Sequence, residues 1–369
     1  IQATFNLTPS LLTQIAEYSS DKMPSDIFYQ LSMKDAGSLE HGEKKFILAN
    51  FFMNNWQTVV HPHPRYCELL RKRGASYDVS KAGEIINRFS DQDFCDLQAL
   101  FNLHWFGYAY KRNTRELQEL CAKERDYTQA DKLCVLEHQR HLIDRIIPLY
   151  KKMQESGQIE ITTSPLFHPI LPLLYADEGE PGFQWRHDAE AHVKGAVKIY
   201  QSLFGRPPRG MWPAEGGVNN SILSLFSKQN IGWIATDEDI LFTSLAASDR
   251  TELLYEPYTA GTNGNKISII FRDRYLSDLI GFSYANSDPQ HAANDFIEHL
   301  ERIRRSVSGR PGEHLVSIIL DGENPWEYYR DGGERFLSLV YGYIQQTDHF
   351  RCTTVSDFLE RFPPRKEVH

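Results

Sequence analysis

The chain has 369 residues and 41% hydrophobic content, which is enough to bury a sizeable core as one large domain or two smaller ones. Its net charge of −9, with no block of Lys and Arg interleaved with aromatic residues, argues against a nucleic-acid partner and fits a neutral ligand better. No apolar run approaches the roughly 18 residues that span a bilayer, and no signal segment opens the chain, so neither membrane anchoring nor secretion is supported.

The cysteines indicate the compartment. They are odd in number, widely spaced and without a CxxC pair, at positions Cys67, Cys95, Cys121, Cys134 and Cys352. This usage is typical of reduced thiols rather than of a disulfide framework. The sequence therefore predicts a cytoplasmic protein whose cysteines pack in the core.

The N-terminal part is predicted to be a strand followed by helices. Ile1–Leu7 alternates in the manner of a strand, and Thr8-Pro9-Ser10 then starts a helix that continues through Tyr18. From about residue 21 to about residue 156 the pattern is almost wholly helical. This predicts a large helical insertion between two strands.

Two features of the helical insertion involve proline. Pro148 is expected to kink or restart the last helix of the insertion. His61 and His63 alternate with prolines, so the segment is expected to form an extended loop on the surface or at the edge of a cleft rather than a metal-binding pair.

After Gly157 the pattern changes from helical to alternating. Gln158–Thr162 is predicted to be a strand, and the loop that follows it delivers His168 just beyond the strand end. An amphipathic helix is predicted over Ala189–Phe204. Asp188 is a natural N-cap of this helix, which would place three residues at the helix entrance, able to contact a ligand: Trp185, Arg186 and His187.

The later strands are predicted to end in polar residues. The predicted strands are Arg209–Trp212, Gly232–Ala235, Lys266–Phe271, His314–Leu320 and Arg351–Thr354. Glu215, Asp237 and Asp321 each follow one of them, and Arg272-Asp273-Arg274 follows another. Strands that alternate with helices indicate a parallel α/β sheet, either doubly wound or closed into a barrel. Because a barrel brings all strand exits to one mouth, the shared polarity of these exits favours a barrel.

Two of these strand exits share a layout in which a carboxylate is flanked by tryptophan. The segment GMWPAEGGV carries Trp212 and Glu215, and IILDGENPWEYY carries Asp321 and Trp326. Two carboxylates from separate strand ends are a possible catalytic pair, and indole suits the C–H face of a sugar ring. The alternative is that Asp321 only caps the next helix and that the tryptophans belong to the core.

Several segments together resemble glycoside hydrolase family 57, the retaining α-glucan enzymes that include α-amylases, 4-α-glucanotransferases, branching enzymes and amylopullulanases. The resemblance runs over nearly the whole chain and is carried by ATFNLTPSLL, GQIEITTSPLFHPILPLL, GMWPAEGGV, RDRYLSDLIGF and LDGENPWEYY. It implies an incomplete (β/α)7 barrel with helical additions, here a single catalytic domain over residues 1–369. The family's first strand, with its His-Gln-Pro-like motif, is expected upstream of Ile1.

The resemblance also implies the roles of three residues. Glu215 corresponds to the nucleophile, Asp321 to the general acid/base, and His168 to a residue that helps to bind the sugar at the cleavage point. No cofactor or metal is implied, and the expected partner is an α-glucan.

This assignment agrees with the chemistry of acetal cleavage. One carboxylate attacks the anomeric carbon while an acid protonates the leaving oxygen, and retention requires the two to lie about 5–5.5 Å apart. We expect Asp321 to be held protonated by partial burial and by nearby carboxylates. The residues expected to bind the sugar, beside His168, are Trp185, His187, Trp212, Asp237, Glu323 and Trp326.

Two other functions are compatible with the sequence. The first is a metal-dependent deacetylase or α-mannosidase on a related barrel, with ligands among His61, His63, His168 and His187. The second is a glucan-binding protein without catalytic activity. If the protein is a glycosidase, its glycosyl group can pass either to water or to another sugar, and the sequence is compatible with both.

Overall fold

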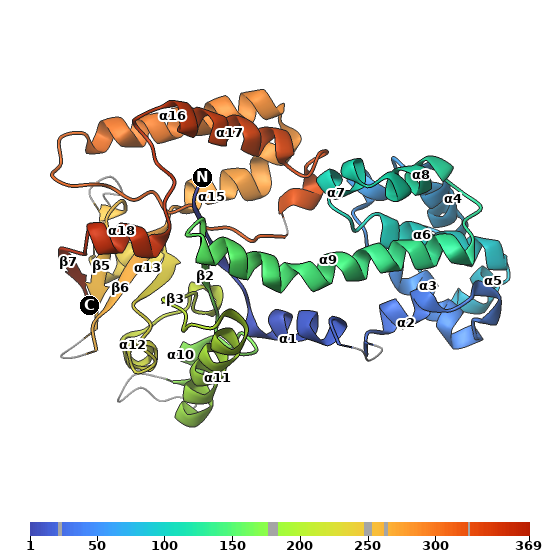
Figure 1. The fold of residues 1–369 in the computed structure, drawn as a ribbon, viewed down its shortest axis with the longest axis horizontal. Helices are drawn as coiled ribbons and strands as arrows, with labels where there is room; N and C mark the ends of the chain where they lie inside the picture. The colour runs from blue at the N-terminus through green and yellow to red at the C-terminus, as the bar shows by residue number, and fades with distance from the viewer. Residues whose placement is uncertain (21–23, 176–183, 247–252, 262–264, 324) are drawn as a thin grey trace. The chain divides into compact units, whose positions relative to one another are not determined.

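The computed structural model describes residues 1–20, 24–175, 184–246, 253–261, 265–323 and 325–369. These residues form two compact units (Figure 1). The sheet unit comprises Ile1–Ile15, Ile146–Pro325 and Glu334–His369, and the helical unit comprises Ala16–Arg145 and Trp326–Gly333.

The strands of the sheet unit run mainly parallel. They are β1 (Ala3–Asn6), β2 (Ile159–Thr162), β3 (Gly210–Met211), β4 (Trp233–Asp237), β5 (Tyr258–Ala260), β6 (Ile267–Arg272) and β7 (Lys366–Val368). β1 pairs with β2, and the other five have the order β3-β4-β6-β5-β7. All neighbours are parallel except β5 and β6, which are antiparallel. Bridges of Thr163 to Met211 and of Ser317 to Arg272, both parallel, extend this order at β2 and at β6.

Helices connect the strands of the sheet unit. They are α10 (Leu171–Leu174), α11 (Arg186–Phe204), α12 (Asn220–Ser227), α13 (Glu238–Ser244), α15 (Arg274–Asp278), α16 (Pro289–Val307), α17 (Glu334–Gln346) and α18 (Val355–Arg361), with the short turns η4 (Ala214–Gly216), η5 (Leu279–Ser283) and η6 (Tyr284–Asn286). This alternation confirms the predicted parallel α/β character.

Several details of the sequence-based prediction are wrong. Only Ser317 of the predicted strand His314–Leu320 pairs with a neighbour, and Arg351–Thr354 is not a strand. β5 and β7 were not predicted. Asp188 is not the N-cap of α11, because the helix begins at Arg186; Asp188 lies in the first turn, where its charge favours the helix dipole.

The two faces of the sheet are covered differently. One face contributes Met211, Ile234, Ile269 and Phe271 to a core that includes residues of α11 and α12. The opposite face contributes Trp233, Ala235 and Ile270 to a cluster with Trp212, Leu315, Ile319, Val355 and Leu359.

Trp233 fits only because residue 210 is glycine: a Cβ there would lie 2.1 Å from Cε2 of Trp233. Its indole nitrogen donates to the buried Glu160 carboxylate, which also accepts from the backbone N–H of Ser356.

The helical unit follows α1 (Pro9–Tyr18). Its helices are α2 (Ile27–Met33), α3 (His41–Asn50), α4 (Pro64–Arg73), α5 (Ala82–Ile86), α6 (Asp91–Leu103), α7 (Tyr108–Asn113), α8 (Arg115–Lys123) and the first part of α9 (Gln129–Glu155), with the short turns η1 (Ala36–Ser38), η2 (Trp56–Val60), η3 (Val79–Lys81) and η7 (Pro325–Tyr328). The described residues between about 21 and 156 are thus mainly helical, as their pattern predicted, and their status as an insertion in a single catalytic domain stays a prediction. α9 continues through Pro148 as a single helix, so of the two expected outcomes, a kink or a restart, the restart is wrong. In the described part of the chain no helix combines the length and apolar character needed to cross a membrane.

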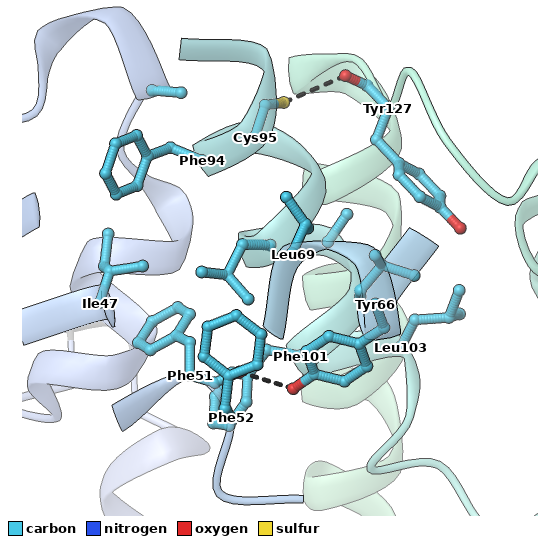
Figure 2. Packing of buried hydrophobic residues seen from close by; sticks show 14 of the residues in the cluster. Ile47, Phe51, Phe52, Tyr66, Leu69, Phe94, Cys95, Phe101, Leu103 and Tyr127 are labelled. Atoms are coloured by element: carbon cyan, nitrogen blue, oxygen red, sulfur yellow. Dashed lines mark hydrogen bonds between the residues drawn. The ribbon is translucent and has the colours of Figure 1, made fainter. Parts of the chain in front are cut away.

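Aromatic packing forms the core of the helical unit (Figure 2). Phe51 and Phe101 stack with ring centroids 4.4 Å apart. The buried Tyr66 hydroxyl donates to the Phe51 carbonyl, and Cys95 donates to the Tyr127 carbonyl over 3.1 Å. All five cysteines of the chain are free thiols.

Candidate active site

Polar side chains collect at the carboxyl ends of neighbouring parallel strands. His168 follows β2, Glu215 follows β3, and Asp237 ends β4. Arg272 ends β6, and Asp321 follows the segment that pairs with Arg272 through Ser317. Because parallel neighbours point the same way, these residues share one edge of the sheet, the edge at which α/β proteins bind ligands.

Glu215 projects from a fixed turn. It occupies the middle of η4, between the buried residues Ala214 and Gly216. The Thr236 hydroxyl, on the neighbouring strand β4, donates to the Gly216 carbonyl and ties the turn to the sheet. The Glu215 side chain is 74% exposed, so its carboxylate can be reached by a ligand.

The structure brings His168 and Glu215 together. Nε2 of His168 lies 3.4 Å from Oε1 of Glu215. Nδ1 of His168 is buried and has no hydrogen-bond partner within the described residues. The exposed side of the imidazole is thus directed at the carboxylate, a position from which it can also donate to a bound hydroxyl.

Backbone strain concentrates at this contact. Phe167, His168 and Glu215 have φ values of 60°, 56° and 56°, in the left-handed region that non-glycine residues rarely adopt. Such a conformation costs about 1–3 kcal/mol per residue and persists where the surroundings over-determine it, often at functional sites. The sequence contains no signal of this strain, and Phe167 was not among the predicted site residues.

Asp237 forms an ion-pair network. Its carboxylate lies 2.6 Å from Arg274 and 3.2 Å from Arg272, and it caps α13 by accepting from the backbone N–H of Asp239. Burial alone would raise the pKa of Asp237, but the hydrogen bonds from Asp239, Arg274 and Arg272 outweigh it and lower that pKa. These contacts favour a positioning role for Asp237, and its predicted role in sugar binding stays a prediction.

Arg272 links this network to the segment that carries Asp321. Its Nε donates to the Ile319 carbonyl over 2.7 Å, two residues before Asp321, and its guanidinium also contacts Asp278. The Ser277 hydroxyl accepts from the Ile319 N–H, so both backbone polar groups of Ile319 are hydrogen-bonded. The sequence places Arg272 at a strand exit, but only the structure identifies its partners.

Asp321 is exposed. The partial burial expected for Asp321 is therefore wrong for the free chain. Glu323, two residues further on, is also exposed.

The predicted tryptophans have different surroundings. Trp212 is half-buried in the cluster with Trp233, as the core interpretation predicted, and its ring lies next to Gly216. Trp185 precedes α11 and is exposed, as is His187 in the first turn of that helix. Trp326 belongs to the helical unit, where it packs against Tyr329 with ring centroids 5.4 Å apart. The roles of these residues in sugar binding stay predictions.

The histidines considered as metal ligands are not grouped. His63 is the N-cap of α4, and its ring packs against that of the buried His104, with centroids 3.7 Å apart and the planes tilted by 32°. Burial and the proximity of His63 lower the pKa of His104 to about 2. Within the described residues, no three His, Cys, Asp or Glu side chains come together as potential metal ligands.

Comparison with known proteins shows relationships to α-glucan enzymes. Alpha-amylase 1 of Dictyoglomus thermophilum is 25% identical over 173 residues, which are 47% of this chain and 22% of that protein. A branching enzyme of Pyrococcus horikoshii aligns with a TM-score of 0.55 at 17% identity, covering 99% of this chain and 71% of that one. The α-amylase AmyC of Thermotoga maritima aligns with a TM-score of 0.54 at 16% identity, covering 75% of this chain and 63% of that one.

These alignments differ in what they cover. The chain spans less than a quarter of the length of the curated amylase, and the structural likeness shows a common fold. A family model, in contrast, matches residues 12–369, nearly the whole chain. The chain belongs to glycosyl hydrolase family 57.

Proposed function

We propose that this protein is a retaining glycoside hydrolase or transglycosylase that acts on α-glucans. The observation that carries the proposal is the contact between His168 and Glu215, at the carboxyl edge of the sheet. Membership of glycosyl hydrolase family 57 and the similarity to an α-amylase and a branching enzyme support the substrate class.

In this proposal Glu215 is the nucleophile. Its exposed carboxylate attacks the anomeric carbon and forms a covalent glycosyl-enzyme, while Asp321 protonates the leaving oxygen. Asp321 then removes a proton from the acceptor, which is water in hydrolysis or a sugar hydroxyl in transfer. His168 binds the sugar beside Glu215, because its Nε2 is already directed toward the reacting carboxylate.

The remaining predicted residues have supporting roles. Trp185, His187 and Glu323 are exposed and available to bind further glucose units. Trp212 packs in the cluster with Trp233 and lies next to Gly216, so it supports the turn that carries Glu215. Asp237 and Arg272 hold the segment that leads to Asp321.

The proposed fold is an incomplete (β/α)7 barrel within a single catalytic domain over residues 1–369. The parallel order β1-β2-β3-β4-β6, extended by the bridges at Thr163 and Ser317, supports this arrangement. So does the N–H of Val355, which donates to the Thr4 hydroxyl on β1 while the Val355 side chain packs against the face of β4 and β6. The free thiols support a cytoplasmic location.

The direct test is incubation with maltooligosaccharides, followed by separation of shortened, lengthened and branched products. We expect Glu215→Gln to reduce turnover by at least about a thousandfold while the fold is kept, because the amide has the size of the carboxylate but cannot attack. Glu298→Gln, a change of the same type on the exposed surface of α16, is the matched control and should retain activity. Substantial turnover by Glu215→Gln would show that another group is the nucleophile.

A further inference from the structure

Phe167 combines a strained backbone with an exposed aromatic side chain. The residue is 72% exposed and has a φ of 60°. An exposed apolar residue is common on protein surfaces and by itself indicates nothing. The left-handed conformation is different, because an exposed side chain gains little burial to offset its cost. Something else must hold Phe167 in this position.

Contacts between the loop Leu166–His168 and α11, here called the clamp, hold Phe167 in place. The N–H of Leu166 donates to the His192 carbonyl over 3.0 Å, and the His192 ring donates from Nδ1 to the Leu166 carbonyl. The same ring meets that of Phe167 edge to face, at 84° with centroids 6.1 Å apart. Leu166 also packs tightly on Gly195, where a Cβ would lie 2.8 Å from its Cδ2. The loop is therefore held to α11 through the N–H, the carbonyl and the side chain of Leu166.

The position that the clamp fixes is adjacent to the candidate nucleophile. His168, the next residue, lies 3.4 Å from Glu215, so one short loop carries both the exposed Phe167 ring and the histidine that contacts the candidate nucleophile. Phenyl rings and the C–H faces of pyranoses pack well, and a rigid aromatic loses little entropy on binding.

We propose that Phe167 is a sugar-stacking residue of this site and that His192 is the positioning residue that holds it there. Phe167 packs against a glucose unit of the α-glucan bound at Glu215. His192 keeps the Leu166–His168 loop in its left-handed conformation. The proposal rests on the proposed function and adds to it a determinant of glucan affinity.

Binding of maltoheptaose by calorimetry tests the role of Phe167. The measurements use the Glu215→Gln chain, in which turnover does not interfere. Adding Phe167→Ala should weaken binding about tenfold, the ratio that about 1.4 kcal/mol produces. Phe167→Trp should retain the affinity. Phe282→Ala is the matched control, because Phe282 is a comparably exposed phenylalanine (79%) on η5 and is not among the residues assigned to the site.

Variants of His192 test the positioning role. His192→Ala should cause a loss of affinity comparable to that of Phe167→Ala, whereas His192→Asn, whose amide can still donate to the Leu166 carbonyl, should restore most of it. A purely structural role would instead lower the thermal midpoint of both variants without rescue of binding by asparagine.

Two outcomes would overturn the inference, and they are distinguishable. If the Glu215→Gln chain binds maltoheptaose and Phe167→Ala binds it as tightly as Phe282→Ala does, the stacking role is wrong and the proposed function is untouched. If the Glu215→Gln chain binds no maltooligosaccharide, the proposed function itself is wrong and the stacking role fails with it.

Discussion

Replacement of Arg272 by methionine removes one cation that three groups of the sheet unit share. Its guanidinium contacts Asp237 and Asp278 and donates to the Ile319 carbonyl. Methionine keeps much of the length and apolar character of the side chain but carries no donor. The substitution therefore tests the network rather than the packing.

The structure sets the expected size of the effect. The side chains of Arg272 and Asp237 are only 19% and 21% exposed, so solvent replaces the lost contacts incompletely. A hydrogen bond to a charged group contributes about 1.5–3 kcal/mol net, and partial exposure reduces this. Asp237 keeps Arg274 as a partner. We expect Arg272→Met to lower the free energy of unfolding by about 2–3 kcal/mol.

The catalytic effect should exceed what lost stability explains. The Ile319 carbonyl lies two residues before Asp321, and a small displacement of a catalytic group has a large effect on rate. We therefore expect kcat on maltoheptaose to fall at least about tenfold at a temperature where the variant remains folded.

Urea denaturation followed by tryptophan fluorescence, together with kcat, checks both expectations. The matched control is Arg302→Met, which removes an arginine whose ion pair with Glu298 lies on the exposed surface of α16, and it should leave stability and activity unchanged. If Arg272→Met loses no more stability or activity than Arg302→Met, the network does not position Asp321.

Three further predictions concern stability. Burial alone would raise the pKa of Asp93, but hydrogen bonds from basic and backbone groups outweigh it and lower that pKa from the ordinary 3.8 to about 2. The ionised Asp93 carboxylate therefore stabilises the fold fully above about pH 4, and this stabilisation is lost as the pH falls toward about 2. In urea titrations, Asp93→Asn should remove about 2 kcal/mol of this pH dependence of the free energy of unfolding. Gly210→Ala should cost at least about 2 kcal/mol, since the new Cβ collides with Trp233; an unchanged melting temperature would show that the indole can move. Tyr66→Phe should cost about 1–2 kcal/mol in thermal denaturation, because the Phe51 carbonyl loses its buried donor, and no loss would mean that water replaces the hydroxyl.

The sequence predicts the elements that periodicity and turn chemistry determine locally. The helical insertion and the strands β2, β4 and β6 follow from their apolar patterns, and Glu215 and Asp321 were identified by the turns that follow apolar segments. β5 and β7 were missed because each has only three residues, too few for an alternating pattern, and β7 pairs with a strand that is distant in sequence. His314–Leu320 reads as a strand, yet only Ser317 pairs, since pairing depends on the neighbour rather than on propensity.

The sequence predicts which residues follow the strands, but it does not predict the contacts that these residues make. His168 was selected because it lies just beyond a strand, and the structure brings it to Glu215. Asp237 was expected to bind sugar, but two arginines contact its carboxylate, a pairing that depends on the register of β4 with β6. The strain at Phe167 could not be predicted from the sequence, because tertiary contacts such as those with His192 impose the left-handed backbone on a non-glycine residue.

Identification of the covalently modified carboxylate tests the central claim most directly. The chain is incubated with a fluorinated glucosyl donor whose glycosyl-enzyme hydrolyses slowly, digested, and sequenced by mass spectrometry. We expect one added glucosyl group per chain, attached to Glu215, and none in Glu215→Gln. Labelling of a different carboxylate, or turnover of maltooligosaccharides with no labelled intermediate, would contradict it.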